Sequence, residues 1–546
     1  MMTTKTADRF VLAAQLSDLR GKGSLSVQVG GYSVVLFLYG EQVYAVDNRC
    51  PHMGFPLDRG TVRDGILTCH WHHARFDLAS GGTFDLFADD VRVFPVEIRD
   101  EQIWVDTSTQ HDVIAHQRDR VNDGLERDIT LVIAKAVLSL MENKVSPVEP
   151  FKIGVDFGTR YRQPGWGQGL TILTCMINLL PHLSAEDKPR ALYHGLSAVA
   201  ADTDSMAPRF VVRPLPDTST DVPTLKRWFR QFVEVRDAEG AERCVISAIR
   251  AGADDKQMAD MLFAAATDHR YIQIGHPLDF TNKAFEALDV IGWDSAEQVL
   301  TSLVGNYTRA SRMEESNAWR YPIDVVALIE AAIDQLNTAV EQGRSKRGTW
   351  NDRQTLVALL MNDDPQATIE GLLTAVREGC APADLAGIVA YAAALRIAQF
   401  HTSNDFGDWD TALHTFTFSN AVHQGLRRVE SLDLLRGVFD AAMSVYLDRF
   451  LNIPAARLPA RDDKSAALTE LDELLNRQQQ VNQAGQVVAR YLYADGDPEA
   501  LLSTLGHLLL RENRDFHTIQ SVEAAFHQYQ LLQGTPEATY VLVAAA

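Results

Sequence analysis

Two short segments near the start of the chain each carry one cysteine and one histidine, and they constrain its fold more than any other feature. Cys50 and His52 are separated by one residue, and after a gap of 16 residues Cys69 and His72 stand three positions apart. Thiolates and imidazoles are common ligands of transition metals in proteins. Two loop tips with this spacing can present two sulfur and two nitrogen ligands to one site. The sequence therefore predicts a metal site assembled from two loops.

Two kinds of metal site fit this ligand set. One is a tetrahedral zinc ion, and the other is a two-iron cluster in which thiolates hold one iron and neutral imidazoles hold the other. Zinc sites usually pair cysteine with cysteine and histidine with histidine on opposite arms. Here each arm supplies one of each, as the mixed-ligand iron-sulfur centre requires. The distribution of ligands therefore favours the iron-sulfur centre over zinc.

The residues around these loops are typical of a small β domain. Runs of β-branched and aromatic residues alternate with turns that contain glycine, such as Gly30-Gly31 and Gly40, and this pattern predicts antiparallel strands. We expect the domain to end near Asp106. The runs are Leu25–Val29, Tyr32–Tyr39, Val43–Val46, Val91–Ile98 and Ile103–Val105.

Residues 9–107 resemble a Rieske-type ferredoxin domain. They are similar to the small soluble ferredoxins of aromatic-ring dioxygenase systems and to the small subunit of assimilatory nitrite reductase. The two ligand loops of that family match at Cys50, His52, Cys69 and His72. The resemblance implies that these four residues bind a 2Fe–2S cluster and that the domain transfers single electrons.

The loops also depart from the family pattern. His70 and His73 stand where the second loop commonly has proline and glycine. High-potential relatives carry an extra cysteine in each loop, and neither 53–56 nor 73–76 contains one. The potential of such a cluster depends on the hydrogen bonds to its sulfur atoms and on its exposure. We therefore expect a low-potential one-electron carrier of the ferredoxin type.

Beyond the β domain the composition changes. Residues 108–124 are polar and predict a linker, whereas from residue 125 onward apolar residues recur at three- and four-residue spacing, which predicts helices. Ile246–Ala266 and Leu373–Ala393 align without gaps, which suggests two related helical hairpins. The expected fold is a multidomain α and β protein, with a tail at 1–8, a small antiparallel β Rieske domain at 9–107, the linker at 108–124 and a large all-α domain at 125–546.

The net charge of the chain disfavours two classes of binding partner. There are 72 acidic and 51 basic residues, a net charge of −21 and a pI near 5.2, which disfavour nucleic acids and anionic membrane surfaces. We find no uncharged apolar run of 18 residues and no signal-peptide pattern. The five cysteines are too scattered for a disulfide framework. We therefore expect a cytoplasmic protein with no nucleic-acid or membrane partner.

The helical domain lacks several familiar site patterns. No histidine has a glutamate three residues before it, which disfavours a carboxylate-bridged di-iron bundle. No phosphate-binding Gly-X-X-X-X-Gly-Lys sequence occurs, and residues 165–169 lack the preceding strand and the last glycine of a dinucleotide site. We therefore expect a separate reductase to donate the electrons. The sequence leaves open whether this domain binds a second metal, a haem or a flavin.

Three short pieces of the helical domain resemble the questin oxidase-like family, whose members are associated with Baeyer-Villiger-type oxidative cleavage of aromatic polyketides. The resemblance implies His194, His276 and His414 as candidate catalytic residues, which bind a metal or stabilise an oxyanion in an oxygen-dependent reaction. The pieces are Ala191–Leu196, Ile274–Leu278 and Leu413–Thr417.

Other polar residues of this domain group along the sequence. Asp410 lies one helical turn before His414, a spacing suited to orienting the imidazole. A separate group near the C-terminal end consists of His507, Glu512, His517 and Glu523.

These features favour one function and leave a second open. The favoured function is that of an oxidoreductase, in which a Rieske cluster passes single electrons to or from an oxygenase-like helical domain that acts on a small organic substrate. The alternative is a non-catalytic ferredoxin whose helical domain docks a redox partner. A polar, histidine-lined pocket inside the helical domain would favour the enzyme. The oligomeric state stays open.

Overall fold

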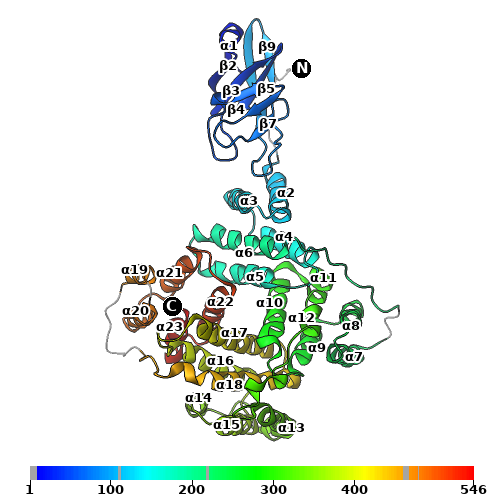
Figure 1. Cartoon of the computed structure of the whole chain (residues 1–546), viewed down its shortest axis with the longest axis vertical. Coiled ribbons are helices and arrows are strands. Elements are labelled where there is room, and N and C mark those ends of the chain that lie inside the picture. The colour runs from blue at the N-terminus through cyan, green and yellow to red at the C-terminus, as the bar shows by residue number, and fades with distance from the viewer. Residues whose placement is uncertain (1–8, 109–111, 217–219, 459–466, 478) are drawn as a thin grey trace, which may run out of the picture. The chain divides into compact units, whose positions relative to one another are not determined.

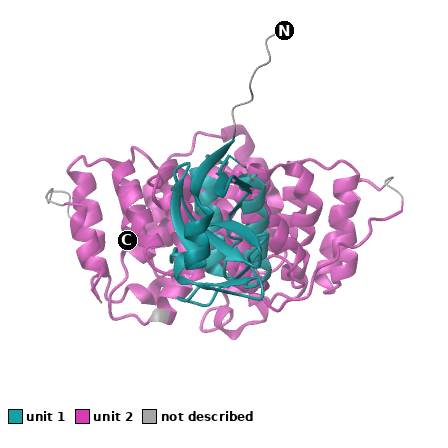
Figure 2. Cartoon of the chain, turned by 90° about the horizontal axis from the view of Figure 1, so that it is seen from above, with its two compact units in different colours: residues 1–145 teal, residues 146–546 magenta. Residues whose placement is uncertain are grey.

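The computed structural model describes residues 9–108, 112–216, 220–458, 467–477 and 479–546. An antiparallel β domain is followed by a large helical region, as expected, and the chain divides into two compact units, 1–145 and 146–546 (Figures 1 and 2). The fold class predicted from the sequence is therefore confirmed. The predicted tail at 1–8 lies outside the described residues. In the described ranges, no helix combines the length and the apolar character needed to cross a bilayer.

Within the described residues, all the strands lie in the first unit. They are β1 (Phe10–Gln15), β2 (Ser24–Val29), β3 (Tyr32–Tyr39), β4 (Gln42–Asp47), β5 (Thr61–Arg63), β6 (Ile66–Thr68), β7 (Arg75–Asp77), β8 (Val93–Phe94), β9 (Val96–Arg99) and β10 (Gln102–Asp106). Its helices are α1 (Leu16–Lys22), α2 (Val113–Glu126) and α3 (Thr130–Glu142).

The second unit is helical. Its first half contains α4 (Val148–Arg160), α5 (Gln168–Leu179), α6 (Asp187–Thr203), α7 (Val222–Glu234), α8 (Ala238–Arg250), α9 (Asp255–Thr267), α10 (His276–Ile291), α11 (Ala296–Thr301), α12 (Val304–Thr308) and α13 (Val325–Gly343). Its second half contains α14 (Arg353–Leu360), α15 (Pro365–Arg377), α16 (Pro382–Ala398), α17 (Phe406–Arg428), α18 (Leu432–Leu447), α19 (Thr469–Leu475), α20 (Val481–Tyr493), α21 (Pro498–Leu510), α22 (Phe516–Leu531) and α23 (Pro536–Ala545).

The strands form three antiparallel sheets, in the orders β1-β10-β9, β2-β3-β4-β8 and β5-β6-β7. Gly30 and Gly31 join β2 to β3 with φ angles of 56° and 86°. Both central residues of such a tight hairpin turn need this left-handed conformation, which glycine adopts without a steric cost. The turn between β5 and β6 uses Asp64 and Gly65 in the same way, with φ angles of 53° and 78°. This tight turn begins the sheet β5-β6-β7, and the loop that contains Cys69 connects its strands β6 and β7.

One predicted strand divides into two. The run Val91–Ile98 contains β8 and β9, which pair in different sheets on either side of Pro95. Proline has no N–H to donate to a β ladder, so a strand is interrupted there. The chain can therefore switch sheets at this point, and the β domain still ends at Asp106 as expected.

Within the segment 108–124, for which the sequence predicts a linker, the residues from Val113 onward form α2. The Asp112 side chain caps this helix by accepting a hydrogen bond of 3.0 Å from the Ala115 N–H. Gly124 of α2 lies so close to α3 that an added Cβ would approach the Ile133 side chain to 2.7 Å. Only a narrow stripe of α2 is buried, so the segment has a polar composition although it is helical.

The two segments that align within the sequence have the same local structure. Ile246–Ala266 runs from α8 through a turn into α9, and Leu373–Ala393 runs from α15 through a turn into α16. Gly252 and Gly379 occupy the same place in the two turns, with φ angles of 85° and 91°. Both segments are therefore helix-turn-helix units with a left-handed glycine after the first helix.

Helices α10, α17 and α22 meet in the middle of the second unit (Figure 1). The Lys283 ammonium of α10 lies between two carboxylates, at 2.8 Å from Glu286 and 2.6 Å from Glu523 of α22. Asn178 of α5 donates to both carboxylates, at 2.7 and 2.8 Å. Burial disfavours the charged form of Lys283, but the two carboxylates outweigh it and raise its pKa above the usual value. The helices are thus joined by a buried ionic network.

We expect Lys283→Met to destabilise the helical unit by about 3–5 kcal/mol, since it leaves two carboxylates buried without their cation. The free energy of unfolding from urea denaturation, followed by far-ultraviolet circular dichroism, measures the effect. Arg344→Met is the matched control, because Arg344 pairs with Glu341 on the surface and such pairs contribute little. Equal destabilisation by the two variants would contradict the prediction.

Candidate functional site

Cys50 and Cys69 each begin a tight loop at the end of a strand. Cys50 follows β4, and its loop is closed by hydrogen bonds from the Cys50 N–H to Phe55 and from the Gly54 N–H to the Cys50 carbonyl, both 2.8 Å long. Cys69 follows β6 and has equivalent bonds with Ala74 and His73, at 2.9 and 3.1 Å. The two loops are therefore closed by the same pair of backbone bonds.

His73 takes the backbone conformation that favours glycine. Its φ angle is 61°, and Gly54, at the same position in the first loop, has a φ angle of 81°. A left-handed conformation costs a residue with a Cβ about 1–2 kcal/mol. The replacement of glycine by His73 therefore keeps the loop geometry at a cost in backbone strain.

The two thiols are buried side by side. Cys50 is 2% exposed and Cys69 is 1% exposed, and both belong to an apolar cluster that includes Leu67 and Phe76. Burial, together with the neighbouring Cys69, raises the pKa of the Cys50 thiol to about 11, although the backbone N–H groups of His52 and Met53 oppose this rise. A bound metal cation reverses such a preference, because it stabilises the thiolate directly.

The imidazoles of His52 and His72, from the same two loops, lie together. Their ring centroids are 4.8 Å apart, and the rings are nearly perpendicular. Phe87 packs against the ring of His52, and Trp71 stacks on that of His72. The His52 Nδ1 atom is buried and has no hydrogen-bond partner among the described residues. A buried imidazole nitrogen with a free lone pair is suited to bind a metal. These four side chains fit a 2Fe–2S cluster.

The comparisons with known proteins agree with this site. A family profile described as the Rieske [2Fe-2S] domain matches residues 9–95. The 3-phenylpropionate/cinnamic acid dioxygenase ferredoxin subunit of Photorhabdus laumondii is 32% identical over 79 residues, which are 14% of this chain and 75% of that protein. The chain belongs to the Rieske family. Its Rieske domain carries a 2Fe–2S cluster and supports electron transfer, so the cofactor predicted from the sequence is confirmed.

Two further proteins are similar to the Rieske domain. Apoptosis-inducing factor 3 of Homo sapiens is 31% identical over 96 residues, and the chain spans only 16% of its length. The ferredoxin of carbazole 1,9a-dioxygenase from Nocardioides aromaticivorans is a solved structure with 29% identity and a TM-score of 0.17; the match covers 18% of this chain and 95% of that one. All these matches concern the Rieske domain, and the helical domain is considered from its own geometry.

Three histidines from distant parts of the helical domain meet at one point. They are His276 at the start of α10, His414 on α17 and His517 on α22, and one ring nitrogen from each lies within 4.8 Å of the others. The Nε2 atoms of His276 and His414 are 3.3 Å apart. Burial and the other two histidines lower the pKa of His276 to about 3. His276 is therefore held as a neutral imidazole, the form in which histidine binds a metal.

Asp410 orients two of these imidazoles. Its carboxylate lies 2.9 Å from Nδ1 of His517, and its backbone carbonyl accepts a 2.7 Å hydrogen bond from Nδ1 of His414. A neutral imidazole that donates through Nδ1 keeps its lone pair on Nε2. The His517 Nε2 atom is buried and has no hydrogen-bond partner in the described part of the chain. Second-shell contacts of this kind commonly fix the tautomer of metal-binding histidines.

A strained turn places His276. Three of the residues that precede it have left-handed φ angles: 41° at Tyr271, 45° at Gln273 and 49° at Ile274. Such conformations are rare for residues with a Cβ, and they cluster at functional sites. Gly275 follows with a φ angle of 96° and packs against Phe418 of α17. Tight packing therefore holds the turn, and with it the His276 ring, in one position.

The structure brings together two of the three histidines suggested by the sequence. His194 lies elsewhere on α6, where its Nε2 atom is 3.1 Å from the Leu510 carbonyl. His517 takes the third place instead. The sequence placed it in a group with His507 and Glu523, but His507 pairs with Asp187 and Glu523 pairs with Lys283. No local spacing could reveal His517, because 103 residues separate it from His414.

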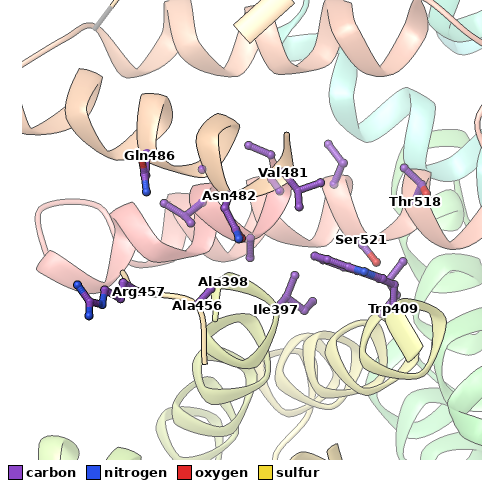
Figure 3. A pocket seen from close by; sticks show the side chains of 17 residues that line it. Ile397, Ala398, Trp409, Ala456, Arg457, Val481, Asn482, Gln486, Thr518 and Ser521 are labelled. Carbon is purple, nitrogen blue, oxygen red and sulfur yellow. The ribbon is translucent and has the colours of Figure 1, made fainter. Parts of the chain in front are cut away.

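A cavity of about 360 Å³ lies beside the same helices (Figure 3). Trp409 from α17 and Thr518 and Ser521 from α22 line it, with apolar residues from α16, α20 and α23. The Ser521 side chain is 7% exposed, and its Oγ atom has no hydrogen-bond partner among the described residues. An apolar cavity of this size with a few polar groups suits a small organic molecule.

Asp279 lies one turn after His276 and is 1% exposed. One of its oxygens accepts from Thr417 at 3.1 Å, and the other has no partner in the described ranges. Burial raises its pKa to about 8. The unfolded carboxyl ionises near its usual value of 3.8, so the unfolded state gains stability relative to the folded state as the pH rises from about 4 to 8.

We expect Asp279→Asn to weaken the loss of stability that the wild type shows between pH 5 and pH 8. Asparagine does not ionise, so the buried carboxyl no longer favours unfolding at higher pH. Urea midpoints of both proteins at the two pH values measure the effect. Asp440 and Asp448 have pKa values raised to about 7, so part of the dependence remains in the variant. The same pH dependence in both proteins would contradict the assignment.

Proposed function

We propose that the chain is an oxidoreductase whose Rieske domain donates single electrons to an oxidising metal site in the helical domain. The observation that carries this proposal is the meeting of His276, His414 and His517 at one point. A cavity that suits a small organic molecule lies along α17 and α22, the helices that carry His414 and His517, although none of the three histidines is among its lining residues. A helical domain that only docked a redox partner would need no group of three convergent imidazoles. The substrate is therefore a small organic molecule that the helical domain binds.

In the Rieske domain, Cys50 and Cys69 hold one iron of the cluster, and His52 and His72 hold the other. The two buried thiols, the two neighbouring imidazoles and the unpartnered Nδ1 atom of His52 support this assignment. When bound, the cluster takes up and releases one electron at a time. The surrounding apolar side chains exclude water from the thiols, and the two closed loops keep the ligands in place.

In the helical domain, His276, His414 and His517 bind a single ion through three imidazole nitrogens. Two nitrogens bound to one tetrahedral ion with bonds of about 2.0–2.1 Å lie about 3.3 Å apart, and this agrees with the spacing of the His276 and His414 nitrogens. Imidazoles bind zinc, copper, iron and nickel. A supply of single electrons favours a redox-active ion such as iron or copper, since zinc has no redox chemistry. Asp410 holds two of the imidazoles in the tautomer that binding requires.

The electrons come from a separate reductase. The sequence has no recognisable site for a nicotinamide or flavin nucleotide, and one relative of the Rieske domain is the ferredoxin subunit of a dioxygenase. A ferredoxin-type domain fused to the domain that it supplies keeps the electron donor at a high local concentration.

His276→Ala should remove one metal ion per chain, beyond the two irons of the cluster, and leave the visible iron-sulfur absorbance unchanged. The variant loses a ligand of the helical site only, and turnover should fall with the metal content. Metal analysis by mass spectrometry and the absorbance spectrum measure both sites. His194→Ala is the control, because His194 lies outside the cluster. A wild type that contains only two irons after reconstitution with ferrous iron would favour a carrier without a catalytic metal.

Cys69→Ser should abolish the visible iron-sulfur absorbance. Serine cannot supply the thiolate that the cluster needs, and the site is buried, so no other sulfur can replace it. Absorbance and electron paramagnetic resonance of the reduced protein measure the loss. Cys244→Ser serves as the control, since Cys244 is also buried but belongs to α8. A colourless wild type that holds only zinc after anaerobic reconstitution would contradict the assignment of the four residues as cluster ligands.

A further inference from the structure

Lys135 of α3 reaches the first ligand loop of the Rieske domain. Its ammonium group donates to the backbone carbonyl of Pro51 at 2.6 Å and to the carbonyl of His52. Lys135 lies outside residues 9–95, which the family profile matches, but in the same compact unit. A lysine from an added helix thus contacts the backbone between Cys50 and His52.

Further contacts hold the helical hairpin α2–α3 against this end of the β domain. The Asp89 carboxylate lies 2.7 Å from Nε2 of His116, and Arg120 donates to the Ala88 carbonyl at 3.0 Å. Ala88 and Asp89 directly follow Phe87, which packs against the His52 ring. Lys135 is therefore one of several contacts that join the hairpin to the loops around the cluster.

The positive charge of Lys135 lies at the first ligand loop, because its ammonium group contacts the carbonyls of Pro51 and His52. The ammonium group is half-buried, so water screens its field less than it would on the surface.

We propose that Lys135 is a positioning residue of the Rieske cluster that fixes the first ligand loop and raises the midpoint potential by its positive charge. This inference rests on the ligation of the cluster by Cys50 and His52. Reduction adds one negative charge to the cluster, and a nearby cation stabilises that charge more than it stabilises the oxidised form. The hairpin α2–α3 is then a part of the electron-transfer module that tunes it, and not a passive connection.

The test compares midpoint potentials in the full-length protein. We expect Lys135→Met to shift the midpoint potential to a more negative value in a redox titration followed by visible absorbance, with the same iron content as the wild type. Lys144→Met is the matched control, because it removes an equal charge from an exposed position just after the same helix, and it should shift the potential less.

Lys135→Arg separates charge from geometry, since arginine keeps the positive charge. Its potential should stay close to that of the wild type. An unchanged potential in Lys135→Met overturns the proposal, and so does an equal negative shift in the arginine variant, because the effect then lies in the loop geometry alone. If Lys135→Met does not retain the cluster, Lys135→Gln replaces it, with the same expected shift and the same contradicting outcome.

The failure of this inference differs from the failure of the proposed function. A wild type without the iron-sulfur spectrum removes the assigned ligands, and with them the basis for any role of Lys135. A wild type with the normal spectrum and a methionine variant of equal potential removes the role of Lys135 alone. Electron paramagnetic resonance of the reduced proteins is a second readout, since a displaced loop changes the g values of the cluster.

Discussion

Two thiols held side by side in an apolar core are the constraint on which the Rieske domain depends. Burial raises the pKa of the Cys50 thiol, and two thiolates this close repel each other, so the pair is stable as an anion only with a cation between. The short sheet β5-β6-β7 and the closed loops exist around this pair. The imidazoles of His52 and His72 complete the same site from its more exposed side. A single metal centre therefore accounts for the loops, for their burial and for the unpartnered Nδ1 atom.

The helical domain places polar groups inside an interior that is otherwise rich in alanine and leucine. Along α10 and α22, matching residues lie opposite each other: His276 and His517 at one end, then Asp279 and Gln520, then Lys283 and Glu523. Polar side chains at three- and four-residue spacing form one face of a helix. Burial of such a face carries a large desolvation cost. The cost is met in part by the ion pairs and hydrogen bonds, and the histidine end retains orphaned nitrogens that a metal would satisfy.

The two sites suggest that the two domains have separate functions. The Rieske domain belongs to a family whose members include the ferredoxin subunit of a dioxygenase, while the helical domain has a cavity and a cluster of three histidines without a cysteine. Electron storage and substrate oxidation would then take place in separate domains of one chain. The hairpin α2–α3 belongs to the electron-storing unit, which explains why a cluster-loop contact and the Asp89 contacts both come from residues beyond the β domain.

Local sequence patterns were sufficient to name candidate site residues wherever those residues lie close together in the chain. The four candidate ligands of the Rieske cluster span 23 residues, and the turn glycines and strand patterns around them are local features. The β patterning therefore predicted the fold, and the loop spacing named the four candidate ligands. The polar segment before α3 was misread because α2 buries only one narrow stripe. His276 and His414 could be named as candidates, but His517 and Lys135 could not. They reach their partners only when segments more than 80 residues apart in the chain pack together, and nothing in the local spacing of side chains encodes which segments will meet.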